Sequence, residues 1–151
     1  MEKNHSYPVG SPQAKFSELV GYALENGNVQ VYHDDEPDNL IEKSAEYHLT
    51  GTDATVFATW IMFKHVVQGP SPELGIDEEE QRLGIEMYGG MLDDDHPVLE
   101  ITMDAKSGEF TKKSLIDEFD SDVVKSEEGV NKILRTIYEW RQDGKLRAAE
   151  L

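Results

Sequence analysis

The chain contains no cysteine among its 151 residues. Disulfide bonds, thiolate metal sites, iron–sulfur clusters and cysteine nucleophiles are therefore excluded. A chain of this length needs no disulfide, because it can bury roughly two thirds of its unfolded surface in one domain. The absence of cysteine also agrees with a reducing compartment. We expect a single domain covering residues 1–151, with flexible ends at residues 1–10 and 146–151.

Long apolar segments are also missing. The longest apolar run, residues 54–67, has about 14 residues and is interrupted by polar side chains, whereas a membrane span needs about 20. Residues 1–10 lack the basic and apolar regions of a signal peptide. We therefore expect no membrane association and a soluble, cytoplasmic protein.

Basic residues are scarce. The 14 Lys and Arg residues stand against 31 Asp and Glu residues, which gives a net charge of −17. This charge repels polyanions, so we expect no direct binding to nucleic acid. The same charge attracts a basic protein and steers it toward the surface. Solubility alone is the alternative reason for such a composition.

The acidic residues are concentrated in one part of the chain. Between Lys64 and Lys106, eleven acidic residues and one basic residue, Arg82, leave a local charge of −10. We expect the loops at residues 68–75 and 89–95 to share one end of a sheet and form a negative face. We assign to this partner-binding face Glu73, Asp77, Glu78, Glu79, Glu80, Glu86, Tyr88, Asp93, Asp94 and Asp95. Tyr88 is included because an aromatic side chain rimmed by acids suits a protein interface. A solvated loop region without a partner is the alternative.

Two segments show helical periodicity. The first begins with Ser11, a favourable N-cap, followed by Pro12 at the first helical position, and ends at Asn26-Gly27. Its apolar stripe comprises Phe16, Leu19, Val20 and Ala23. The second begins near Ser121 or Ser126 and ends at Gly144. Its apolar stripe comprises Val130, Ile133, Leu134, Ile137 and Trp140.

Runs of β-branched and aromatic residues between these helices predict strands. We predict strands at residues 28–33, 82–88, 97–103 and 109–115, with a turn at 104–108 between the last two. The apolar run at 54–67 predicts a central strand covered on both faces, with a buried helix as the alternative.

Two shorter segments are less clear. Residues 40–49 fit a helix or a strand, and we favour a strand near the end of that segment. Residues 77–80 are expected to form one helical turn. The fold class is therefore α+β, with an antiparallel sheet of five to six strands and an N-terminal and a C-terminal amphipathic helix packed on one face.

No motif indicates catalysis. The chain has no G-x-S-x-G sequence, no Walker loop and no G-x-G-x-x-G sequence. His33 and His65 lie in predicted strands and could be neighbours, and a histidine beside a carboxylate can act as a general base. Half-buried sheet histidines are the alternative. The acidic run at 93–96 lacks the spacing of a calcium loop. We therefore predict no metal and no cofactor.

Three function classes follow. The best supported is a non-enzymatic acidic protein that docks on a basic protein and neutralises it, as inhibitors, immunity proteins and nucleic-acid mimics do. The second is a small dimeric chaperone or adaptor, because the order of elements resembles secretion-chaperone-like α+β folds in layout alone. The third is an enzyme or ligand-binding domain that uses histidine and carboxylates.

Overall fold

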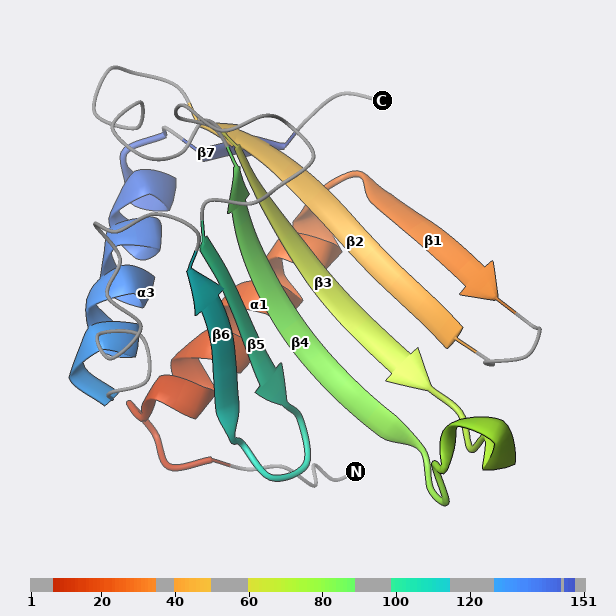
Figure 1. Cartoon of the computed structure of the whole chain (residues 1–151). Coiled ribbons are helices and arrows are strands. Elements are labelled where there is room, and N and C mark those ends of the chain that lie inside the picture. The colour runs from red at the N-terminus through yellow and green to blue at the C-terminus, as the bar shows by residue number, and fades with distance from the viewer. Residues whose placement is uncertain are drawn as a thin grey trace.

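A computed structural model shows one antiparallel sheet with two helices packed on one face (Figure 1). The structure describes residues 7–34, 40–49, 60–88, 99–114, 127–144 and 146–148. The strands are β1 (Val29–Asp34), β2 (Leu40–Leu49), β3 (Trp60–Gln68), β4 (Glu80–Tyr88), β5 (Leu99–Asp104), β6 (Phe110–Ser114) and β7 (Leu146–Ala148). Strands β1 to β6 pair in chain order, and β7 pairs with β2. The predicted α+β class and antiparallel sheet are confirmed.

Helix α1 (Pro12–Asn26) has the predicted N-terminus, because the Ser11 hydroxyl accepts a hydrogen bond from the Ala14 N–H at 3.2 Å. Its C-terminus depends on Gly27 for a steric reason. A Cβ atom there would lie 2.9 Å from both the Ala23 carbonyl oxygen and the Tyr47 hydroxyl. The Tyr47 hydroxyl donates to that same carbonyl at 2.9 Å, so the end of α1 is attached to β2.

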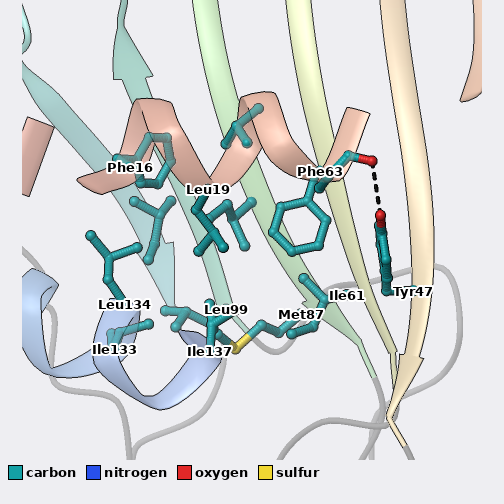
Figure 2. Packing of buried hydrophobic residues seen from close by; sticks show 14 of the residues in the cluster. Phe16, Leu19, Tyr47, Ile61, Phe63, Met87, Leu99, Ile133, Leu134 and Ile137 are labelled. Carbon is teal, nitrogen blue, oxygen red and sulfur yellow. Dashed lines mark hydrogen bonds between the residues drawn. The ribbon is translucent and has the colours of Figure 1, made fainter. Parts of the chain in front are cut away.

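Helix α3 (Glu127–Gln142) packs beside α1 and completes the core. Figure 2 shows its apolar stripe meeting side chains from α1 and the sheet. The helix ends as predicted near Gly144, which has a positive φ of 75°. The buried residues that α3 contributes are Val130, Ile133, Leu134 and Ile137. The side chain of Trp140 lies outside the described residues.

The alternation of side chains along the strands explains why one face is covered. In β3, Ile61 and Phe63 are fully buried toward the helices, whereas Trp60, Met62 and Lys64 point to the other face. We call that other face the open face, since no described helix covers it (Figure 1). The prediction of a central strand is confirmed for residues 60–67, and residues 54–59 lie outside the described part of the chain. The expectation that both faces of this strand are covered is wrong, because its residues on the open face are only partly buried.

Three other segments differ from the predictions. All of residues 40–49 form β2, because pairing with both β1 and β3 overrides the weak local pattern. The expected helical turn at 77–80 is wrong. The turn instead occurs at η2 (Pro72–Leu74), where proline suits the first position, and Glu80 already pairs with Gln68. Residues 146–148, expected to be flexible, form β7 because β2 extends beyond β1 and offers a free edge.

The predicted hairpin between β5 and β6 is confirmed. The Asp104 carboxylate accepts hydrogen bonds from the backbone N–H groups of Lys106, at 2.9 Å, and Ser107, at 2.8 Å. Gly108 has a φ of 76°, which a side chain would disfavour. The hydroxyl of Tyr7 donates to the Ala105 carbonyl, so the turn also receives a contact from the N-terminal segment. Among the helices that the structure describes, none is long and apolar enough to cross a membrane.

Candidate functional site

Strand β4 separates the two acidic loops that the sequence predicted to lie together. Residues 69–79 precede β4 and residues 89–98 follow it. A strand of nine residues spans about 30 Å at about 3.3 Å per residue. The described residues that flank the two connections, Gln68 and Glu80 for the first and Tyr88 and Leu99 for the second, therefore lie at opposite ends of the sheet, contrary to the prediction that both loops share one end. Residues 89–98 themselves lie outside the described residues, and with them Asp93, Asp94 and Asp95.

The loop before β4 instead lies beside the turn between β5 and β6, at the lower end of the sheet in Figure 1. The backbone N–H of Ala105 donates to the Gln81 carbonyl at 2.9 Å and holds the two segments together. Residues 75–81 and 104–106 line a hollow between them, which we call the acidic hollow. Its charged lining residues are Asp77, Glu78, Glu79, Glu80, Asp104 and Lys106. Four predicted site residues therefore meet at one place.

The acidic hollow retains most of its negative charge. Lys106 Nζ lies 3.5 Å from Glu78 Oε1, but both side chains are about four-fifths exposed, so this ion pair is weak. Arg82 approaches Glu80 at 3.6 Å from the adjoining part of β4. The backbone N–H of Ser107, with further help from the backbone N–H of Lys106, lowers the pKa of Asp104. Asp104 therefore stays ionised at neutral pH.

The prediction from sequence left Asp104 out of this site, although Asp104 lines the hollow. It included Glu73, which is exposed on η2 but does not line the hollow. The signal for Asp104 was available. A hairpin turn after β5 must return to the same end of the sheet as the loop before β4, because β5 runs antiparallel to β4. Placing the loops by strand direction would therefore have identified Asp104.

Glu86 and Tyr88 lie elsewhere, on the open face. Glu86 is six residues along β4 from Glu80, which corresponds to about 20 Å. The residue is only 7% exposed, and its carboxylate accepts a hydrogen bond from the Tyr88 hydroxyl at 2.5 Å. Lys64 Nζ lies 3.1 Å from Glu86 and 3.2 Å from Glu42. We call these four residues the Lys64 cluster.

The Lys64 cluster has shifted proton affinities with clear causes. Burial by itself lowers the pKa of Lys64, but the two carboxylates outweigh burial and the pKa is raised. Burial raises the pKa of Tyr88, and its hydrogen bond to Glu86 raises it further. Tyr88 also stacks on Trp60, with ring centroids 5.2 Å apart and an interplanar angle of 3°. Trp60 thus lies half-buried on the open face.

The histidines do not form the predicted pair. His33 in β1 and His65 in β3 are separated by β2, so at least two interstrand spacings, about 10 Å, lie between them. The ring Nε2 of His65 lies 2.9 Å from the amide oxygen of Gln81. His48 lies 3.1 Å from Glu46 in an exposed position. Within the described ranges, no three His, Asp or Glu side chains are arranged to hold a metal ion.

Comparison with known proteins found no matching family model, no matching curated sequence and no matching solved structure.

Proposed function

We propose that this chain is a non-enzymatic binding protein that docks on a basic protein through the acidic hollow. The observation that supports the proposal is the convergence of five carboxylates from two segments on one hollow that contains a single ammonium group. Exposed like charges repel one another, so the approach of a positively charged surface relieves this repulsion and lowers the free energy of the arrangement.

A protein fits the acidic hollow better than a small cation does. The four carboxylates of residues 77–80 are all exposed, and they extend along a loop and the start of β4. An extended row of carboxylates matches several Lys or Arg side chains on a partner surface and gives a high association rate at low salt. Inhibitors and immunity proteins of basic enzymes, and mimics of nucleic acid, use this kind of complementarity, and we place the chain in that class.

Glu86 and Tyr88 have a structural role in this proposal. Their polar groups already bind one another and Lys64, so a partner would have to break these contacts to use them. The exposed residues 77–80 offer their charge at a smaller cost, because the contacts of Glu78 with Lys106 and of Glu80 with Arg82 are exposed to solvent and weak. Glu73 lies on the same loop and would extend the contact at its margin.

Two variants with the same net charge test the proposal. Glu78→Gln/Glu79→Gln/Glu80→Gln removes three charges from the acidic hollow. Glu25→Gln/Glu128→Gln/Glu139→Gln removes three exposed charges from α1 and α3 and serves as the control. Each protein is used to capture partners from a lysate of the native host, and binding of the captured basic protein is then measured by calorimetry at two salt concentrations.

We expect the hollow variant to lose at least tenfold in affinity, while the control stays within about twofold of the wild type. We also expect affinity to fall as salt rises, because screening weakens exposed charge pairs. Equal binding by the two variants would contradict the role of the hollow. Binding that ignores salt would contradict a charge-driven contact.

One observation favours the second candidate, a dimeric chaperone or adaptor. Apolar side chains are exposed at one margin of the sheet, namely Val31, Tyr32 and Ile41. Such a margin is suited to pairing between protein chains. A monomer at high concentration would count against this candidate.

A further inference from the structure

The two edge strands of the sheet, β1 and β6, are protected to different degrees against pairing with another strand. An edge strand presents unpaired backbone groups, and proteins commonly guard such strands with lysine, proline or a bulge. Strand β6, at one end of the order, has Lys112 and Lys113 in its sequence. Strand β1, at the other end, reads Val-Gln-Val-Tyr-His-Asp and contains neither lysine nor proline. Among the described strands β1 pairs only with β2, so its outer edge is open (Figure 1).

Two of the four described exposed side chains of β1, Val31 and Tyr32, carry apolar area, and the other two, Gln30 and His33, are polar and uncharged at neutral pH. Val31 is 50% exposed and Tyr32 is 57% exposed, and they point to opposite faces of the sheet. An added strand would cover part of both side chains and satisfy the backbone groups of the outer edge. The edge therefore offers directional hydrogen bonds together with apolar area.

Charge indicates which strand could be added. Two copies of a chain with a net charge of −17 repel one another over most of their surface. Residues 27–33 contain no Asp, Glu, Lys or Arg, and the charged residue of β1 is Asp34 at its end, so repulsion is weak along residues 29–33 of the strand. A strongly basic segment would be drawn to the acidic hollow rather than to this neutral edge. The neutral edge fits another neutral edge, and a second copy supplies one.

The geometry points to a homodimer in which β1 pairs antiparallel with β1 of a second copy. Residues opposite each other in an antiparallel pair point to the same face. Val31 is in register with Lys43 of β2, on the same face as the buried Ala45, so it lies on the helix side. Placing Val31 opposite Val31 of the second copy satisfies this rule about a two-fold axis perpendicular to the sheet.

This register has two consequences. It places Gln30 opposite Tyr32 on the open face, where the aromatic ring gains a neighbour. It also joins the two sheets into one continuous sheet with all helices on the same side. The helices do not block this arrangement, because α1 packs on β2, β3 and β4 and not over the outer edge of β1.

The absence of cysteine makes a direct test possible. Val31→Cys creates a chain with a single thiol, and opposed residues of an antiparallel pair have Cα atoms about 4.5–5.5 Å apart, within the range that a disulfide spans. Leu74→Cys is the control, because Leu74 is equally exposed (52%) but lies on η2. Under mild oxidation at low protein concentration we expect most of the Val31→Cys chain, and little of the Leu74→Cys chain, to form a covalent dimer. Equal cross-linking of both variants would overturn the proposal.

Sedimentation velocity gives an independent measurement on the unmodified chain. We expect a dimer for the wild type, and a monomer for Val31→Lys/Tyr32→Lys with an unchanged circular dichroism spectrum. Val9→Lys, at a fully exposed position outside β1, is the control and should stay dimeric. A monomeric wild type at all concentrations, a dimer that survives the lysine variant, or a β1 edge occupied by a different protein would overturn the proposal. The inference does not depend on the basic-partner proposal, because charge variants of the acidic hollow should bind weakly yet remain dimeric.

Discussion

Phe63 and Lys64 are neighbours on β3 and lie on opposite faces of one sheet. Phe63 is fully buried against the helices and forms an edge-to-face contact with Tyr47, with ring centroids 5.4 Å apart. Lys64 is about three-quarters covered on the open face, yet it is covered by carboxylates rather than by a helix. One face is thus stabilised by apolar burial and the other by paired charges.

Net charge alone is a poor guide to a binding site, because acidic side chains of this chain differ in how far their charge is already paired. Glu86 is buried, its charge is paired with that of Lys64, and it accepts a hydrogen bond from the Tyr88 hydroxyl. Glu78 belongs to the same acidic part of the chain, but its ion pair with Lys106 is exposed and weak. Glu42 and Glu86, within their strands, therefore stabilise the open face, whereas residues 77–80, in the connection before β4 and at its first position, remain exposed.

The largest expected effect is on the helix side of the sheet. Phe63→Ala removes a fully buried ring from the centre of the core and should lower the free energy of unfolding by about 3–5 kcal/mol. Chemical denaturation followed by circular dichroism measures this loss. A loss below about 1 kcal/mol would mean that the apolar face is not the main source of stability.

A smaller loss is expected on the open face. Lys64→Ala leaves the buried Glu86 without its cation and should cost about 1–3 kcal/mol. Adding Glu86→Gln should recover part of the loss, because no buried charge is then left uncompensated. Denaturation of the single and double variants measures both effects. If the double variant is no more stable than Lys64→Ala, the lost ion pair with Glu86 is not the cause of the destabilisation.

The open face should also respond to alkaline pH. The folded chain raises the pKa of Tyr88 above the unfolded value of about 10, so this stabilisation is complete below pH 10 and is lost as pH rises through the folded pKa. The raised pKa of Lys64 acts in the same direction. Tyr88→Phe should cost about 1 kcal/mol at pH 7 and should flatten the alkaline fall in stability. A wild-type stability that is constant between pH 9 and 11 would contradict this account.

The smallest effect on stability is expected in the acidic hollow. Glu78→Gln changes an exposed side chain and should alter the free energy of unfolding by less than about 0.5 kcal/mol. The same variant should weaken binding of a basic partner, which calorimetry would detect. A large loss of stability would show that Glu78 stabilises the fold, as Glu86 does, and would contradict the contrast between these two residues.

The helices and most strands could be predicted because their signals are local. Ser11 and Pro12 define the start of α1, and the periodicity of Phe16, Leu19 and Val20 identifies its buried face. The turn after β5 follows from Asp104 and Gly108 in the same way. Each of these features depends on residues within a few positions of one another.

The candidate site was harder to predict because it depends on strand direction. Local pattern placed Glu80 and Glu86 on one surface, but β4 carries them about 20 Å apart. The burial of Glu86 depends on Lys64 from the neighbouring strand and could not be read from its own sequence context. Strand β7 was missed for a similar reason, since its partner in β2 is about 100 residues away in the chain.

The position of α1 before the sheet in the chain has a consequence for synthesis. Phe16, Leu19 and Val20 leave the ribosome before the strands and the helix that bury them. The pairing of β1 to β6 in chain order allows the sheet to assemble progressively as each strand emerges. The apolar stripe of α1 must therefore stay in contact with water, or with a ribosome-associated chaperone, until at least β4 has been made.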